Sequence, residues 1–198
     1  MAAGNAPDLT LQTRQALEHL TLGAAKDRAE ALVWLAEHGT MAVSHPVSLR
    51  LKDDDPAIRE LAEQVLWAIW TRSGDPQTDQ VLEQGAKALA DDDYAEALER
   101  FDQVVQRQPD FAEGYNKRAT TLYLMGDYLR ALDDVETTVK LNPDHFGALS
   151  GGGLCMLKLG RPAEALFYFE RALQINPNME GIRQMAEQLR NLKPRPLI

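Results

Sequence analysis

The stretch "PDFAEGYNKRATTLYLMGDYLRALDDVETTVKLNP", residues 109–143, begins and ends with a proline, and a further proline follows at position 177. These three prolines are 34 residues apart and stand within "QRQPDF", "KLNPDH" and "QINPNM". A fixed period of this length indicates repeated supersecondary units that stack on one another. The period therefore decides the fold more than any single motif does.

Shifting the sequence by 34 residues brings side chains of similar kind into register. The aligned sets are Gly85, Ala119 and Gly153; Ala97, Ala131 and Ala165; Leu98, Leu132 and Leu166; and Phe101, Val135 and Phe169. Each unit has the pattern of two amphipathic helices joined by a tight turn, in "ADDDYAEAL", "LMGDYLRAL" and "KLGRPAEAL". Proline closes each unit because it disfavours a helical conformation of the preceding residue and cannot continue the previous helix.

These columns, turns and prolines resemble the tetratricopeptide repeat (TPR), a helix–turn–helix of this period. The resemblance implies an all-α, right-handed αα superhelix over residues 77–192, with repeats at 78–111, 112–145 and 146–179. The segment "MEGIRQMAEQLRNL" then predicts a C-terminal capping helix, followed by a tail at 193–198. Its apolar stripe is formed by Ile182, Met185, Leu189 and Leu192.

Residues 1–76 predict a helical N-terminal segment of a different kind. Helical periodicity is visible in "LQTRQALEHL", "AKDRAEALVWLAEHG", "MAVSHPVSLRL" and "DPAIRELAEQVLWAIWTRSG". The part "HPVSLRLKDDDPAIRELAEQVL", residues 45–66, resembles one HEAT-like helical pair. Asp55 has the character of an N-cap with Pro56 in the first turn.

We expect the N-terminal segment to pack on the first repeat, because Trp67, Ile69 and Trp70 need cover and "RSGDPQT" is too short for a free tether. Deletion of residues 1–73 should then lower the melting temperature, followed by circular dichroism, and expose apolar surface. If the truncated protein melts at the same temperature, the two parts are independent.

Charge and composition indicate which kinds of partner and which cellular compartment the sequence favours. The net charge is −9, with 7 basic against 11 acidic residues up to Pro76 and 14 against 19 after it, so we expect neither nucleic acid nor an anionic membrane as a partner. No apolar run approaches the roughly 20 residues of a membrane helix, and "MAAGNAPDLT" lacks the features of a secretory signal. The lone cysteine, Cys155, excludes an internal disulfide framework. We expect a cytoplasmic protein, or one of an organelle interior if a transit peptide has been removed.

The glycine-rich stretch "HFGALSGGGLCMLKLG", residues 145–160, does not fit a phosphate-binding loop. No Gly-Lys-Ser/Thr follows, Met156 stands where a dinucleotide fingerprint has its third glycine, and no strand precedes it. Glycine within a helix costs roughly 1 kcal/mol relative to alanine. Two explanations remain open for Gly147, Gly151 and Gly152: close packing between helices, or a groove in which a ligand approaches the backbone.

Catalytic and metal-binding patterns are missing from the sequence. The four histidines, His19, His38, His45 and His145, have no metal-ligand spacing and fit surface or capping roles. The triads Asp53–Asp55 and Asp91–Asp93 lack the glycine and distal glutamate of an EF-hand and fit helix starts and turns. Because no acid, base, nucleophile or metal ligands converge, we expect a protein that is not an enzyme and needs no cofactor or metal.

The resemblance implies a peptide-binding groove lined by the first helix of each repeat. Its residues at helical spacing are Leu82, Ala86, Leu89, Asn116, Thr120, Tyr123, Ser150, Gly151, Leu154 and Leu157. The Asn116 amide could bind a peptide backbone, since it has both donors and an acceptor. The alternative is that these residues meet the capping helix or the N-terminal segment.

Repeat proteins that hold the acidic tails of heat-shock chaperones use a clamp of lysine, arginine and asparagine. At those columns this chain has Leu82, Ala86, Lys117, Gly147 and Gly151, so a carboxylate-clamp adaptor is not expected. We expect a non-catalytic interaction module, a scaffold or assembly factor, that binds a peptide or helix of a partner protein. The alternative is a self-associating subunit of a larger complex, a homo-oligomer with its groove occupied internally.

Overall fold

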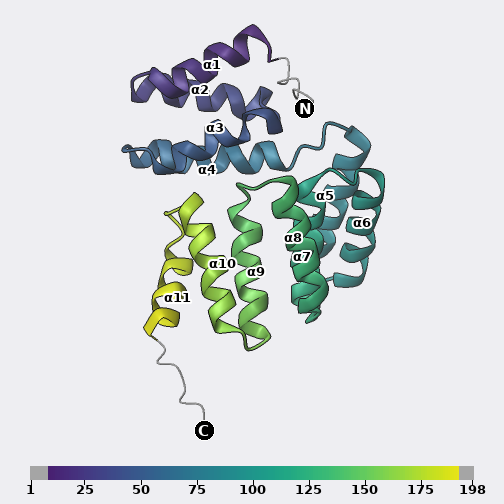
Figure 1. The fold of residues 1–198 in the computed structure, drawn as a ribbon. Helices are drawn as coiled ribbons and strands as arrows, with labels where there is room; N and C mark the ends of the chain where they lie inside the picture. Colours follow the sequence, from purple (N-terminus) through teal and green to yellow (C-terminus); the bar gives the residue numbers. More distant parts are fainter. Residues whose placement is uncertain (1–8, 192–198) are drawn as a thin grey trace, which may run out of the picture. The chain divides into compact units, whose positions relative to one another are not determined.

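The computed structural model describes residues 9–191, and every regular element within that range is helical (Figure 1). The prediction of an all-α fold is confirmed. None of the described helices combines the length and apolar character needed to cross a bilayer. The chain divides into two compact units, Met1–Arg72 and Ser73–Ile198, each of which is described by itself.

Between residues 9 and 72 the N-terminal unit contains four α-helices and two 3-10 helices. They are α1 (Leu11–Leu22), α2 (Ala25–His38), η1 (Met41–Val43), α3 (Ser44–Ser48), η2 (Leu49–Lys52) and α4 (Pro56–Trp70). The segment "MAVSHPVSLRL", which shows helical periodicity, is helical but divides into η1, α3 and η2. In a continuous helix the ring of Pro46 would clash with the carbonyl of Ala42; instead α3 begins at Ser44, which places the proline in a first turn.

The aspartate triads serve the ends of helices, as predicted. The Asp55 carboxylate accepts the backbone N–H of Ala57 at 2.9 Å and caps α4, whose first residue is Pro56. The Asp93 carboxylate accepts the N–H of Glu96 at 3.1 Å and caps the helix that follows it. Among residues 9–191, no three His, Cys, Asp or Glu side chains are grouped so as to hold a metal ion.

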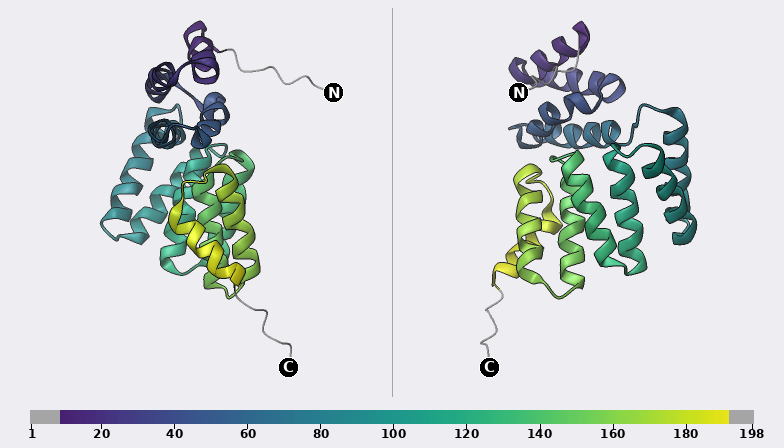
Figure 2. Two further views of the ribbon diagram at one scale, coloured as in Figure 1. Left: turned by 90° about the vertical axis from the view of Figure 1, so that its left-hand side faces the viewer. Right: turned by 45° about the vertical axis from the view of Figure 1, so that its right-hand side comes forward.

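The second unit is a row of helical pairs, in which each helix runs antiparallel to its neighbour (Figures 1 and 2). The helices are α5 (Pro76–Ala90), α6 (Tyr94–Arg107), α7 (Ala112–Met125), α8 (Tyr128–Leu141), α9 (Phe146–Lys158), α10 (Pro162–Ile175) and α11 (Glu180–Asn191). Three pairs and a terminal helix confirm the architecture predicted from the period.

The start of this unit lies four residues earlier than the predicted boundary at 76/77. The reason is local hydrogen bonding: the Ser73 N–H donates to Asp79 at 2.7 Å, and the Asp75 carboxylate accepts the Thr78 N–H at 3.1 Å. These bonds tie residues 73–75 to the first turn of α5.

The turns within the three pairs share one backbone conformation. The left-handed φ values of Asp92 (60°), Gly126 (85°) and Gly160 (72°) recur at the repeat period. Glycine adopts this conformation without a steric cost, whereas aspartate tolerates it as a single residue.

The core of each pair is built from a small residue on the first helix and a larger one on the second. A Cβ on Gly85 would lie 2.6 Å from the Phe101 ring, and one on Gly153 would overlap the Phe169 ring. In the middle repeat the same two columns hold Ala119 and Val135. Alanine is larger than the glycine of the other repeats, and valine is smaller than their phenylalanine, so the two changes compensate in volume.

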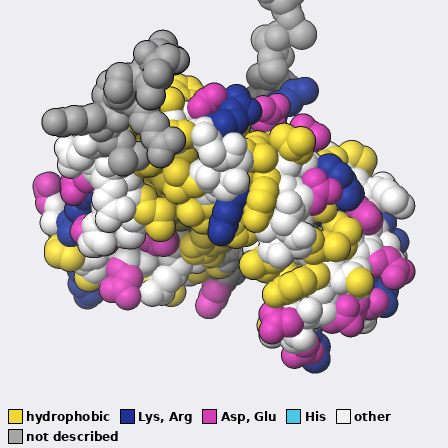
Figure 3. All heavy atoms as spheres, turned by 90° about the horizontal axis from the view of Figure 1, so that it is seen from below, with side chains coloured by type: hydrophobic (Ala, Val, Ile, Leu, Met, Phe, Trp, Pro, Cys, Tyr) yellow, Lys and Arg dark blue, Asp and Glu magenta, His cyan; other side chains and the backbone are white. Residues whose placement is uncertain are grey.

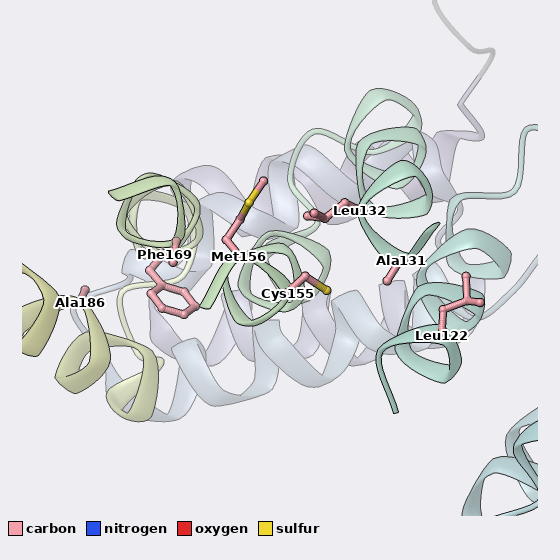
Figure 4. Packing of buried hydrophobic residues seen from close by; sticks show 8 residues of the cluster. Leu122, Ala131, Leu132, Cys155, Met156, Phe169 and Ala186 are labelled. Carbon is pink, nitrogen blue, oxygen red and sulfur yellow. The ribbon is translucent and has the colours of Figure 1, made fainter. Parts of the chain in front are cut away.

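The C-terminal core joins α7 to α11 (Figure 4). Its buried residues are Leu122, Ala131, Leu132, Cys155, Met156, Ala165, Phe169 and Ala186. The predicted stripe residues Ile182, Met185 and Leu189 pack against this cluster, which confirms α11 as the capping helix. Leu192 and the predicted tail at 193–198 lie outside the described residues.

A chain of ion pairs fastens the first pair to the second. Arg118 on α7 donates to both carboxylate oxygens of Asp134 on α8, at 2.8 and 2.7 Å, and to Asp102 on α6 at 2.7 Å. The hydrogen bond to Asp134, opposed by burial and assisted by both charges, raises the pKa of Arg118 above its ordinary value. One guanidinium group thus connects three helices.

Candidate functional site: an apolar groove between α7 and α9

A cavity of about 290 Å³ lies between α7 and α9. It is lined by Asn116, Ala119, Thr120, Tyr123, Leu124, Val135, Gly147, Ala148, Ser150, Gly151, Leu154 and Cys155. All of these residues except Val135 lie on α7 or α9, which are the first helices of the second and third pairs. None of them carries a charged side chain.

The cavity brings together six of the ten residues predicted for the groove. They are Asn116, Thr120, Tyr123, Ser150, Gly151 and Leu154. Among the others, Leu82 is only 5% exposed in the core between α5 and α6, and Leu89 packs against the same core. Leu157 packs against the C-terminal core, and Ala86 is half-buried outside the lining.

Several lining residues were not predicted. Leu124 follows Thr120 by four positions, so the helical spacing itself could have identified it; Gly147, four positions before Gly151, was absent from the predicted lining although a groove role was left open for it. Val135 could not be found in this way because it comes from α8, a second helix of a pair.

The consecutive glycines have different environments. A Cβ on Gly152 would lie 2.8 Å from the Tyr168 ring and 3.0 Å from Val135, and Gly153 meets Phe169. A Cβ on Gly151, in contrast, would meet no atom within 4 Å. Close helix packing therefore explains Gly152 and Gly153, whereas Gly151 leaves open space in the cavity wall.

The polar side chains of the lining are largely engaged with their own helices. The Thr120 hydroxyl donates to the Asn116 carbonyl at 3.0 Å, and the Ser150 hydroxyl donates to the Gly147 carbonyl at 2.9 Å. The Asn116 amide donates to Glu113 at 3.1 Å. The surface that remains for a ligand is mostly apolar.

A fully buried pair, Glu113 on α7 and His145 before α9, lies beside the cavity. The backbone N–H of Ala148 donates to Nδ1 of His145 at 3.0 Å, so Nε2 carries the proton that is donated to Glu113 Oε2 at 2.9 Å. His145 is the N-cap of α9, which is one of the two roles, surface or capping, predicted for the histidines. Lys117 Nζ lies 3.4 Å from Glu113 Oε1, which places a negative charge beside the lysine next to the groove.

Cys155 belongs to the C-terminal core and also lines the cavity. Its side chain is buried, and desolvation raises the pKa of the thiol to about 11. Because the thiolate is the nucleophilic form, this thiol is unreactive at neutral pH.

The open space at Gly151 gives a stability prediction. Gly151→Leu should leave the fold intact and raise the free energy of unfolding by up to about 1 kcal/mol, since leucine is the better helix former. Urea denaturation followed by circular dichroism measures the change. Gly181→Leu is the matched control, because Gly181 is also helical with no atom within 4 Å of an added Cβ. A loss of stability in Gly151→Leu alone would assign Gly151 to helix packing.

Comparison with known proteins points to one repeat family. The family model described as "Tetratricopeptide repeat" matches residues 116–180. A TPR repeat-containing protein of Rhizobium etli is 32% identical over 124 residues, which are 61% of either chain. The chain thus spans about three fifths of the length of this curated relative.

Solved structures share the same fold at low identity. The first TPR domain of Spaghetti (RPAP3), bound to the HSP90 peptide SRMEEVD, has a TM-score of 0.57 and 23% identity, covering 59% of this chain and 93% of that one. The TPR2B domain of yeast Sti1, in a complex with pHsp70, has a TM-score of 0.56 and 18% identity, covering 60% and 100%. The Sgt2 TPR domain of Aspergillus fumigatus has the same TM-score and identity, covering 63% and 89%.

Proposed function

Because residues 116–180 match the tetratricopeptide-repeat family model, we propose that this chain is a non-catalytic scaffold or assembly factor whose α7/α9 groove binds a segment of a partner protein. Repeats of this kind are generally an interaction fold. The single observation that carries the proposal is the apolar cavity whose wall is left open at Gly151.

The partner segment that we propose differs from the chaperone peptides named for the similar domains. Of the five clamp columns, Leu82, Ala86, Gly147 and Gly151 carry no charge, and the fifth, Lys117, pairs with Glu113. An acidic peptide tail would find no free cluster of cations there. We therefore propose a partner segment that is recognised by apolar contacts.

Self-association is the second candidate, and exposed apolar side chains favour it. Leu124, Met125 and Leu129 (64% exposed) lie at the turn between α7 and α8, and Phe167 on α10 is 58% exposed. Figure 3 views the molecule from below, and hydrophobic side chains, coloured yellow, gather on the face that it shows. Light scattering over a range of protein concentrations tests this candidate. If the protein self-associates, its molar mass in solution rises above that of one chain as the concentration increases.

A peptide selection tests groove binding. A displayed library of random peptides of about 16 residues, long enough for about four helical turns, is selected on the full chain. Each selected peptide is then titrated against wild type, Gly151→Leu and Gly181→Leu.

We expect peptides whose affinity falls about tenfold or more in Gly151→Leu, because leucine fills the open wall, and is unchanged in Gly181→Leu. A selection that yields no peptide sensitive to Gly151→Leu would refute the proposed site.

A further inference from the structure

We infer that the partner segment enters the α7/α9 groove as an amphipathic α-helix, with an uncharged apolar stripe against Gly151 and a basic outer face. This inference rests on the proposed function. It specifies the conformation and the charge of the ligand that the groove recognises.

The first argument concerns the hydrogen bonds of the ligand. A buried backbone N–H or C=O needs a partner, and an extended peptide would have to find its partners in the groove. The groove wall consists of helices, whose main-chain groups are bonded within each helix. The donors of Thr120 and Ser150 are also engaged internally. A helical ligand satisfies its own backbone and needs only apolar contact from the wall.

The second argument concerns volume. An apolar cavity of about 150 Å³ holds one benzene-sized group. The groove, at about 290 Å³, therefore has room for about two such groups. Side chains three or four positions apart on a helix lie close enough to enter together. Leu124 also lines the groove and is 47% exposed, which adds apolar surface for a further contact.

The third argument concerns charge. The lining carries no charged side chain, so a charge on the inserted stripe would be desolvated without a partner. The sequence after Pro76 has 19 acidic against 14 basic residues, and the nearby Lys117 is paired with Glu113. A basic outer face on the ligand therefore complements the net negative charge of the second unit.

Designed peptides test these features separately. The first is a fluorescein-labelled Ala/Lys helix with leucines at positions i, i+3, i+4 and i+7. The second has the same composition with the leucines distributed around the helix. The third is the striped peptide with two central prolines, and the fourth is the striped peptide with glutamate in place of lysine. Each is titrated by fluorescence anisotropy against full-length wild type, Gly151→Leu and Gly181→Leu.

We expect the striped basic peptide to bind wild type and Gly181→Leu equally, and to bind Gly151→Leu about tenfold or more weakly. The dispersed, proline-containing and acidic peptides should each bind wild type at least about tenfold more weakly than the striped basic one. The preference over the acidic peptide should shrink as salt is added.

The remaining outcomes separate this inference from the proposed function. Equal binding of the proline-containing or dispersed peptide would overturn the helical ligand, and equal binding of the acidic peptide would overturn the basic face. If no designed peptide binds while the library yields peptides sensitive to Gly151→Leu, the inference is wrong and the proposed function stands. If the library also yields none, both are wrong.

Discussion

Arg118→Ala should lower the free energy of unfolding by about 2 to 4 kcal/mol, the largest effect that we expect from a single side chain. Removal of one partner of a buried ion pair leaves the other charge desolvated and unpaired. The Asp134 side chain, at 7% exposed, would lose both of its bonds to the guanidinium. The Arg118 side chain is 20% exposed and that of Asp102 is 39% exposed. Partial exposure to water keeps the expected loss of stability below that for a fully buried ion pair.

Urea denaturation of Arg118→Ala, Asp134→Ala and the double variant measures this coupling. The double variant should be more stable than the sum of the two single losses implies, because it leaves no buried charge. Arg130→Ala is the matched control, since Arg130 pairs with Asp127 on the surface and should contribute less than about 1 kcal/mol. Equal losses for Arg118→Ala and Arg130→Ala would contradict the structural role of the ion-pair chain.

Gly153→Ala should lower the free energy of unfolding of the second unit by about 1 to 3 kcal/mol, although alanine is the better helix former. The added methyl group overlaps the Phe169 ring, whose side chain is fully buried. Either the ring must shift within the packed core or the helices α9 and α10 must separate, and both cost packing energy. Thermal and urea denaturation would both register the change.

The middle repeat suggests the compensating change. Ala119 and Val135 occupy the columns of Gly153 and Phe169, so Gly153→Ala combined with Phe169→Val copies a pairing that this fold already accommodates. The double variant should be more stable than Gly153→Ala alone. If it is less stable, the clash with Phe169 is not what destabilises the single variant.

The sequence was sufficient for the repeat unit because local and long-range signals agree there. The 34-residue period gave the three pairs, and the matched small and large columns gave their packing. In the N-terminal unit a helical pattern covers "MAVSHPVSLRL", yet the proline at position 46 restricts where α3 can begin. Periodicity alone does not include that steric limit.

The candidate site was predicted in part, for a physical reason. The resemblance implied which helices line the groove, and helical spacing on those helices then found Asn116, Thr120 and Gly151. Helical spacing does not show how closely neighbouring helices approach. That approach buries Leu82 in the core of its own pair and brings Val135 from a second helix into the lining.

The charged side chains of α7 reach both neighbouring repeats, with a consequence for cooperativity. Arg118 bonds to Asp102 in the first repeat, and Glu113 bonds to His145 at the start of the third. In a solenoid, where each unit contacts only its neighbours, such interface bonds determine whether the repeats unfold one at a time or together. Opening of the middle pair would break the bonds to both neighbouring repeats, so the three repeats should unfold in a single transition.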